Sequence, residues 1–295
     1  MSALISKKSP ARRIVFELTP VKLKFPLQDV TVSQVTETNS VNNPVLEDGF
    51  VAISQNQFQL KVSGLATYFA TNGKEIQVAP EPGADPAHVN LYLQGSVFGA
   101  ILHQRKILPL HGSSFSWQGK GICICGETLA GKSSLTTSFC LEGGGLLADD
   151  VTPIRMLDGQ PIILPRSGRV KLWKDSMEAL GLDTVNLETT GSGEPKYHQP
   201  LPQPGDKNTP LTHIIVLETG AVNHMIHETL SGVAAFTALR NQIYRWEYLP
   251  AMPETEAAYL QQLINISKTI PITKVSRPEN IAIKETKNYF RSIIK

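Results

Sequence analysis

The sequence predicts an α/β protein in two parts: a smaller β-rich N-terminal domain (residues 1–84) and a C-terminal domain (residues 85–295) with helices packed on a mixed sheet. Up to residue 79, apolar and polar residues alternate with the period of a strand. A proline and a glycine then interrupt the pattern within residues 81–85. Strand-like and helix-like segments alternate after this break, which is typical of a sheet covered by helices.

The composition indicates a globular protein. The chain has 295 residues, 41% of them hydrophobic and 18% charged, which excludes a disordered, charge-rich chain. The net charge is +2 and basic residues do not cluster, so we expect neither nucleic acid nor a membrane surface as a partner. The apolar runs are too short for a membrane span and the N-terminus does not resemble a secretory signal, so the sequence favours a cytoplasmic location.

In the N-terminal part, the alternation predicts antiparallel hairpins. Val21, Leu23 and Phe25 alternate with lysines, and Asn72-Gly73 separates two further strand-like runs. An Asn-Gly pair between alternating segments is a strong hairpin signal. After the break, Asp85 and Pro86 predict the start of a helix that links the two parts.

The C-terminal part alternates strands, helices and one long loop. The loop, residues 186–210, has no period. It could be a mobile lid whose Lys196, Tyr197 and His198 reach a substrate, and the alternative is a surface loop with no part in function. Of the three cysteines, Cys123 and Cys125 lie in an apolar run and are expected to be reduced core residues. Strands are expected at residues 108–117, 122–125, 146–148, 151–156, 161–164, 211–217 and 225–230, and helices at residues 133–141, 176–180, 233–243, 254–266 and 280–294.

The clearest motif is a phosphate-binding loop of the Walker A type between a predicted strand and a predicted helix. Its glycines let backbone N–H groups surround a phosphate, Lys132 reaches the β- and γ-oxygens, and the Ser133 hydroxyl binds Mg²⁺. The alternative is a glycine-rich structural turn with an exposed lysine. The residues expected to bind the nucleotide are Gly126, Glu127, Thr128, Leu129, Ala130, Gly131, Lys132, Ser133 and Ser134.

Two adjacent acids follow the next predicted strand. Asp149 and Asp150 would face the phosphates from a strand end, where one carboxylate can bind Mg²⁺ and the other can orient or deprotonate an attacking hydroxyl. The alternative is a solvated turn, which aspartate favours. His111 lies in the strand expected beside the loop strand, and both a catalytic role and an ordinary structural role stay open for it.

These motifs, in this order and with this short gap before the acids, resemble the catalytic domain of HPr kinase/phosphorylase. Most other phosphate-loop enzymes place the corresponding acid much further along the chain. Further segments resemble HPr-kinase-like proteins from gene clusters for modified peptides, including lasso peptides. The first resemblance is carried by Leu110-His111-Gly112, residues 122–134 and Leu147-Ala148-Asp149-Asp150. The second is carried by residues 82–86, 103–105, 108–111, 170–173, 239–240 and 243–245.

The resemblance implies a P-loop, HPr-kinase-like C-terminal domain that uses ATP and Mg²⁺ to phosphorylate the C-terminal serine of a precursor peptide. It implies that Asp149 is the base, Asp150 a magnesium ligand together with Ser133, and His111 the partner of Asp149. A homo-oligomer is possible. The Glu-Ile-Arg-Gly-type segment of the bifunctional enzymes is not recognisable, since residues 164–169 take its place. This departure argues against phosphorylase activity and against HPr as the substrate.

A cation for the transferred phosphoryl group is expected from the helix at residues 233–243. Arg240 is the candidate, Arg245 competes with it, and the alternative is that Arg240 only stabilises the end of its helix. Three functions are compatible with these residues. The first is a kinase for a peptide serine or threonine, the second is a kinase for HPr, another protein or a small hydroxyl metabolite, and the third is a nucleotide-binding sensor with little turnover.

Overall fold

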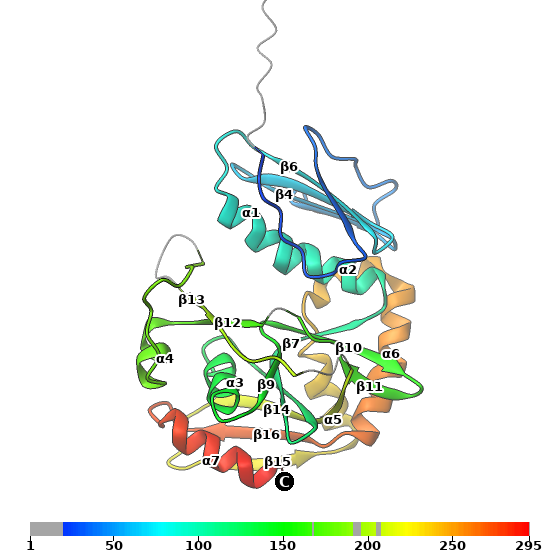
Figure 1. Cartoon of the computed structure of the whole chain (residues 1–295). Helices are drawn as coiled ribbons and strands as arrows, with labels where there is room; N and C mark the ends of the chain where they lie inside the picture. Colours follow the sequence, from blue (N-terminus) through cyan, green and yellow to red (C-terminus); the bar gives the residue numbers. More distant parts are fainter. Residues whose placement is uncertain (1–19, 167, 191–195, 205–207, 295) are drawn as a thin grey trace, which may run out of the picture.

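The computed structural model describes residues 20–166, 168–190, 196–204 and 208–294. It arranges them as two large sheets, one above the other, and one two-stranded ribbon, with helices between and around the large sheets (Figure 1). The alternation that precedes residue 20 lies outside the described residues. Within the described part of the chain, no helix is both long and apolar enough to cross a bilayer.

The first sheet has the strand order β1-β6-β5-β4-β3-β2. Its strands from β2 to β6 form the predicted antiparallel hairpins, whereas β1 pairs with β6 in parallel. Asn72 and Gly73 make the turn between β5 and β6 with positive φ angles of 53° and 65°. The strands are β1 (Thr31–Gln34), β2 (Leu46–Glu47), β3 (Val51–Ser54), β4 (Gln57–Val62), β5 (Ala66–Thr71) and β6 (Glu75–Pro80).

The strand prediction is wrong for the segment around Val21, Leu23 and Phe25. These residues form no regular strand, yet their side chains are partly buried against the core of the first sheet. The alternation therefore reflects one buried side of an extended segment that lacks a strand partner, because side chains alternate in any extended chain whether or not it is paired.

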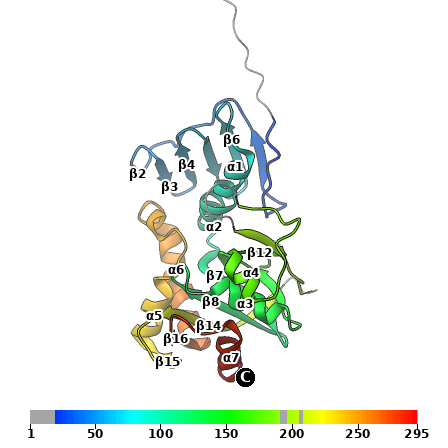
Figure 2. The same ribbon diagram turned by 90° about the vertical axis from the view of Figure 1, so that its left-hand side faces the viewer.

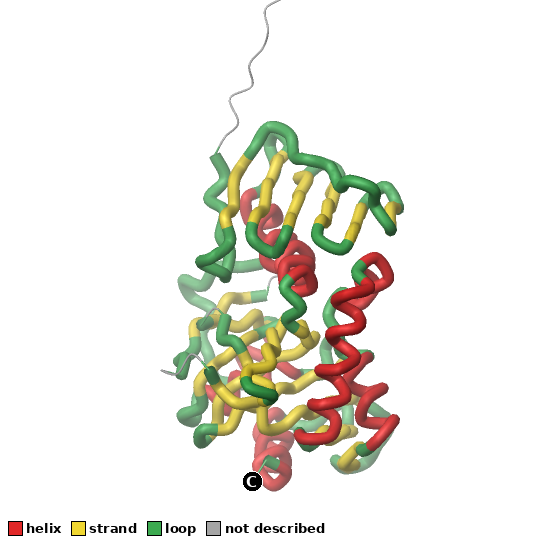
Figure 3. The backbone as a smooth tube through the Cα atoms, turned by 90° about the vertical axis from the view of Figure 1, so that its right-hand side faces the viewer, coloured by secondary structure: helices red, strands yellow, loops and turns green. Residues whose placement is uncertain are grey.

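The predicted connecting helix is confirmed, and it packs against one face of the first sheet. It comprises α1 (Pro86–Tyr92), a π-helical turn η1 (Leu93–Val97) and α2 (Phe98–Gln104), and Asp85 caps it by accepting a hydrogen bond from Ala87 N at 2.9 Å. Figures 2 and 3 show these helices beneath the strands. They share their core with the first sheet and with the 3₁₀ helix η2 (Trp246–Ala251). The domain boundary after residue 84 stays a prediction.

The second sheet is mixed, as predicted, with the order β11-β10-β7-β8-β14-β16-β15 and with β9 paired to β7. The pairs β8–β14 and β14–β16 are parallel and the other pairs are antiparallel. Its strands are β7 (Leu108–Trp117), β8 (Lys120–Gly126), β9 (Gly145–Ala148), β10 (Val151–Leu157), β11 (Gln160–Ile163), β14 (Thr209–Thr219), β15 (Ile226–Leu230) and β16 (Ile272–Arg277).

Helices cover both faces of this sheet. Along β14, Ile214 and Val216 pack with α5 and α6, whereas Ile215 and Leu217 pack with α3 and α7, because successive side chains of a strand point to opposite faces. Cys123 and Cys125 are buried, which confirms that they are core residues, and Cys140 is buried as well. The helices are α3 (Lys132–Cys140), α4 (Lys174–Ala179), α5 (Gly232–Arg240), α6 (Pro253–Thr269) and α7 (Ile283–Ile293).

Three strands were not predicted. β16 lies inside the second sheet, and β12 (Arg169–Leu172) pairs with β13 (Tyr197–Pro200) in a separate ribbon. β13 and the start of β14 fall within residues 186–210, so that segment is not a structureless loop. Its glycines at 191 and 193 lie outside the described residues, and its role as a lid stays a prediction.

One pairing decides where the site forms. β7 lies between β8 and β9 and is paired to β8 on one side and to β9 on the other. β9 and β10 follow one another along the same edge of β7, so Ala148 is opposite Ser114 and Val151 is opposite His111. The acid pair sits at the break between these two strands.

Candidate active site

The phosphate loop runs from the end of β8 to the start of α3. Gly126 has φ +136°, and a Cβ there would lie 2.1 Å from the Leu217 carbonyl oxygen, so only glycine fits. Gly131, with φ +96°, precedes α3, and no side chain caps this helix. The first N–H groups of α3 are therefore available to an anion, and residues 131–134 line a cavity of about 450 Å³.

Lys132 lies within the curl of the loop. Its Nζ donates hydrogen bonds to the carbonyl oxygens of Gly126 at 2.7 Å and Glu127 at 2.8 Å. The side chain is buried, and this burial lowers the pKa of its ammonium group. Backbone oxygens thus hold the Lys132 ammonium group next to the start of α3. A phosphate oxygen can replace them as the acceptor of its hydrogen bonds.

Ser133 and Asp149 form the centre of the site. The Ser133 hydroxyl donates to Asp149 Oδ1 at 2.7 Å, and the Lys171 backbone N–H donates to Asp149 Oδ2 at 2.9 Å. A hydroxyl and a carboxylate held together are the hard oxygen ligands that suit Mg²⁺, which is usually bound through one or two carboxylates and substrate phosphates. The residues present therefore fit a magnesium ion between Ser133 and Asp149.

Asp150 adopts a left-handed backbone conformation, with φ +70°, at the break between β9 and β10. Its backbone oxygen accepts from Gly112 N at 3.2 Å, so the turn is anchored to β7. One carboxylate oxygen lies 3.3 Å from Lys171 Nζ and the other 3.9 Å from His111 Nε2. Burial alone would raise the pKa of Asp150, but Lys171 and His111 outweigh it and the pKa is lowered. The carboxylate is held ionised between two basic groups.

The contacts of the two acids differ from those that the resemblance implied. His111 is the partner of Asp150 rather than of Asp149, and Ser133 contacts Asp149 rather than Asp150. The reason is the strand break, which turns the two consecutive side chains toward different neighbours. The roles of the two acids as base and metal ligand stay predictions. The pKa of His111 is lowered, first by burial and then by the charge of Lys132.

The structure does not bring Arg240 to this site. Its guanidinium lies 3.9 Å from Glu256 on α6, with about half of the side chain exposed, and it lines a separate cavity between α5 and α6. α5 ends at Arg240, and the chain then turns back toward β7, so Gln242 reaches the phosphate loop instead. The catalytic prediction for Arg240 is corrected on this ground.

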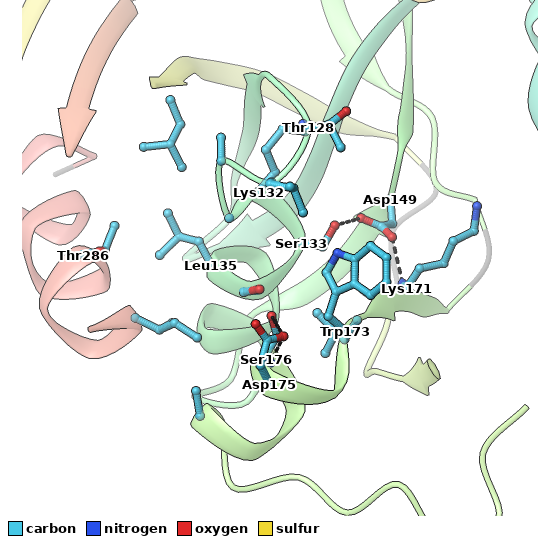
Figure 4. Close-up of a pocket in the computed structure, with 18 of the residues that line it drawn as sticks. Thr128, Lys132, Ser133, Leu135, Asp149, Lys171, Trp173, Asp175, Ser176 and Thr286 are labelled. Carbon is cyan, nitrogen blue, oxygen red and sulfur yellow. Dashed lines mark hydrogen bonds between the residues drawn. The ribbon is translucent and has the colours of Figure 1, made fainter. Parts of the chain in front are cut away.

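Several cavity residues were missed by the sequence reasoning. Arg277 at the end of β16 donates to the Ala130 oxygen in the phosphate loop at 3.0 Å and to two further backbone oxygens. Trp173 lines the same cavity as Ser133 and Asp149 (Figure 4), and Lys196 Nζ lies 4.7 Å from the centre of its ring. Arg277 had no motif signal, whereas Trp173 belongs to the segment at residues 170–173 that carries the resemblance and Lys196 belongs to the possible lid. The other residues that line the cavity and were not named as site residues are Leu135, Lys171, Leu172, Asp175, Ser176, Ala179, Leu217, Glu279, Ile281, Ile283 and Thr286.

Comparison with known proteins gives partial similarities. Over 83 residues the chain is 36% identical to an HPr kinase/phosphorylase of Azoarcus sp. (strain BH72) and 35% identical to one of Aromatoleum aromaticum (strain DSM 19018 / LMG 30748 / EbN1). Each match covers 28% of this chain, which thus spans about a quarter of the length of these relatives. No protein-family model matches the chain.

Among solved structures, the Hpr(Ser) kinase/phosphatase of Coxiella burnetii aligns with 63% of this chain and 95% of its own, at 15% identity and a TM-score of 0.34. The sequence matches agree with the part of the resemblance that names HPr kinase/phosphorylase. The narrower resemblance to proteins of peptide-modifying gene clusters stays a prediction.

Proposed function

We propose that this chain is a Mg-ATP-dependent kinase that phosphorylates a serine or threonine hydroxyl of a ribosomal, lasso-type precursor peptide, with the C-terminal serine of that peptide as the acceptor. The observation that supports a kinase most directly is the hydrogen bond between Ser133 and Asp149, which joins the phosphate loop to the acid pair. A phosphate loop without a placed carboxylate would bind a nucleotide, whereas this pairing also provides a metal site beside it.

The nucleotide and the metal would be held by the phosphate loop and its neighbours. The N–H groups at the start of α3 and the Lys132 ammonium would bind the phosphates, and Ser133 with Asp149 would hold Mg²⁺. When bound, Mg²⁺ offsets the negative charge on the phosphate oxygens. Ile281 and Ile283 give the same cavity an apolar wall, which suits the base of a nucleotide.

The acceptor chemistry is assigned to Asp150 and its two basic neighbours. The acceptor hydroxyl oxygen attacks the γ-phosphorus, the bond from that phosphorus to the β–γ bridging oxygen breaks, and the hydroxyl proton passes to the Asp150 carboxylate. His111 and Lys171 each lie near a different oxygen of this carboxylate and would orient it. Lys171 would also supply the cation that was expected from Arg240.

The choice of a peptide acceptor depends on the sequence. The segments at residues 170–173 and 243–245 resemble kinases of peptide-modifying clusters, and the segment typical of the bifunctional HPr enzymes is not recognisable. A kinase for HPr remains the second candidate, because the curated relatives that match over 83 residues carry that name.

The test uses the purified full chain with Mg-ATP and a lasso-type precursor peptide that ends in serine, with intact mass as the readout. We expect one phosphoryl group on the intact peptide and none on a peptide whose C-terminal serine is replaced by alanine. HPr is incubated in parallel. Phosphorylation of HPr alone would favour the second candidate, and nucleotide binding without transfer to either acceptor would favour a sensor.

A further inference from the structure

Gln242 connects the phosphate loop to the strand that carries His111. It is not among the residues that line the cavity. Its side-chain oxygen Oε1 accepts a hydrogen bond from Gly126 N at 3.0 Å. Its backbone oxygen accepts one from His111 N at 2.7 Å. One residue thus contacts both the first residue of the phosphate loop and the histidine that faces Asp150.

The neighbours of Gln242 explain this position. Tyr244 N donates to the Pro109 oxygen at 2.8 Å, and Ile243 forms an isolated bridge with Leu110, so residues 242–244 lie along the first part of β7. Further along β7, β8 takes over this edge, and its last pair is Cys125 opposite Gly112.

Gly126 is the first residue beyond that ladder. Its N–H group is buried and has no strand partner on the β7 side, and the amide of Gln242 supplies the acceptor that a further strand residue would have supplied. Gly126 has little freedom to move toward another acceptor, because the Leu217 oxygen already blocks the space beside its Cα.

We infer that Gln242 is a positioning residue that holds the start of the phosphate loop in register with His111, and that nucleotide affinity depends on it. The inference rests on the proposed function, since it takes the loop to be the nucleotide site. Gln242 acts through Gly126 and does not contact the nucleotide. If the bond is lost, the buried N–H of Gly126 has no acceptor, and the loop must shift to satisfy it.

The experiment compares two variants of nearly equal side-chain length in the full chain. Gln242→Met removes the acceptor, and Gln242→Glu retains it. Hydrogen exchange of the Gly126 amide is followed by NMR. Binding of the fluorescent analogue mant-ATP is measured in the presence of Mg²⁺, at a temperature well below the melting temperature of each variant. Gln262→Met is the matched control, because it removes a side-chain hydrogen bond to a backbone oxygen, that of Lys106, away from the loop.

We expect Gln242→Met to lose the protection of the Gly126 amide and to bind mant-ATP about 10-fold more weakly. Removing a residue that supports a binding group commonly lowers the affinity of a site by about this factor. Gln242→Glu should keep the amide protected, and Gln262→Met should bind mant-ATP like the wild type even where its melting temperature falls equally. A protected Gly126 amide or unchanged mant-ATP affinity in Gln242→Met would overturn the inference. A wild-type chain that does not bind mant-ATP would instead overturn the proposed function.

Discussion

Ser133 and Asp149 share a hydrogen bond of 2.7 Å although β7 separates the strands that lead to them. The phosphate loop follows β8, and the acids follow β9 on the far side of β7. Two features bring the side chains together. The loop leads into α3 across the end of the sheet. The strand pairing with β7 is interrupted between β9 and β10, next to His111. Asp149 accepts this bond, whereas Asp150 lies near His111 and Lys171. The two acids therefore lead to different predictions.

Asp149→Asn should weaken Mg²⁺ binding. The amide keeps the shape of the side chain, but it replaces a charged oxygen ligand beside Ser133 with a neutral group. We expect the Mg²⁺ concentration needed for half-maximal phosphoryl transfer to rise by at least about 10-fold. Asp175→Asn, at an exposed acid elsewhere on the cavity wall, is the control and should leave the Mg²⁺ requirement unchanged.

Asp150→Asn should keep Mg²⁺-dependent nucleotide binding and lose phosphoryl transfer. An amide cannot take the proton of the acceptor hydroxyl, and loss of a general base costs roughly 10² to 10⁴ in rate. Affinity for Mg-ATP by calorimetry and transfer rate by mass spectrometry separate the two effects. If Asp149→Asn lost transfer while Asp150→Asn lost only Mg²⁺ affinity, the roles implied by the family resemblance would stand after all.

Lys171→Met should reduce the transfer rate on the order of 10²-fold, the usual effect of removing one group that stabilises developing charge. The methionine keeps most of the apolar stem and removes the cation that lies 3.3 Å from Asp150. Lys174→Met is the matched control, because Lys174 pairs with the exposed Glu178 on the same helix and not with Asp150. Equal rates in the two variants would show that Lys171 has no part in the reaction.

The strands around the site followed from the sequence because they carry local signals. β8 has a continuous apolar run at residues 122–125, and the loop between β8 and α3 has a motif whose spacing depends on the size of a phosphate. The acid pair was found because it follows a short apolar strand. These signals all lie within a few residues of the groups they predict.

The partner of each acid could not be predicted, because it depends on strand order. No local pattern states that β7 lies between β8 and β9, and only that order puts His111 beside Asp150. Lys171 and Arg277 were missed for the same reason, since their strands enter the site from distant parts of the chain. Arg240 was misplaced because helical spacing does not reveal where the helix ends relative to the sheet.

Arg240→Ala should leave phosphoryl transfer within about twofold of the wild type. Its pair with Glu256 is half exposed, and such surface pairs contribute about 0 to 1 kcal/mol to the free energy of unfolding. The rate of peptide phosphorylation and a urea unfolding curve are the two measurements. A large fall in rate at unchanged stability would restore the sequence-based prediction that Arg240 acts on the phosphoryl group.

The stability of the protein should depend on pH through His103, which is fully buried between the first sheet's helices and α6. Its Nε2–H donates to the Tyr244 oxygen at 3.0 Å, and its Nδ1 lies 3.1 Å from the Tyr259 hydroxyl. Burial disfavours the charged ring and lowers the pKa of His103 from 6.5 to about 4, even though the backbone contacts oppose the shift. The folded protein therefore takes up this proton only near pH 4.

The sign follows from comparing the two states. Above pH 6.5 the ring is neutral in both, and His103 adds no pH dependence. Between pH 6.5 and about 4 the unfolded chain binds a proton that the folded chain does not, so the free energy of unfolding falls as the pH falls, by about 3 kcal/mol in total. Below about pH 4 both states are protonated and this contribution stops changing.

Urea unfolding of the wild type and of His103→Gln at a series of pH values tests this. Glutamine can donate to the Tyr244 oxygen from the position of Nε2 but does not titrate, so the variant should lose most of the slope between pH 6.5 and 4. His198→Gln is the comparison, because burial also lowers the pKa of His198 to about 4 but its partial exposure weakens the effect on stability. If His103→Gln kept the full slope, the acid sensitivity would have to come from other groups, and His103 would be protonated in the folded protein at a higher pH than its burial implies.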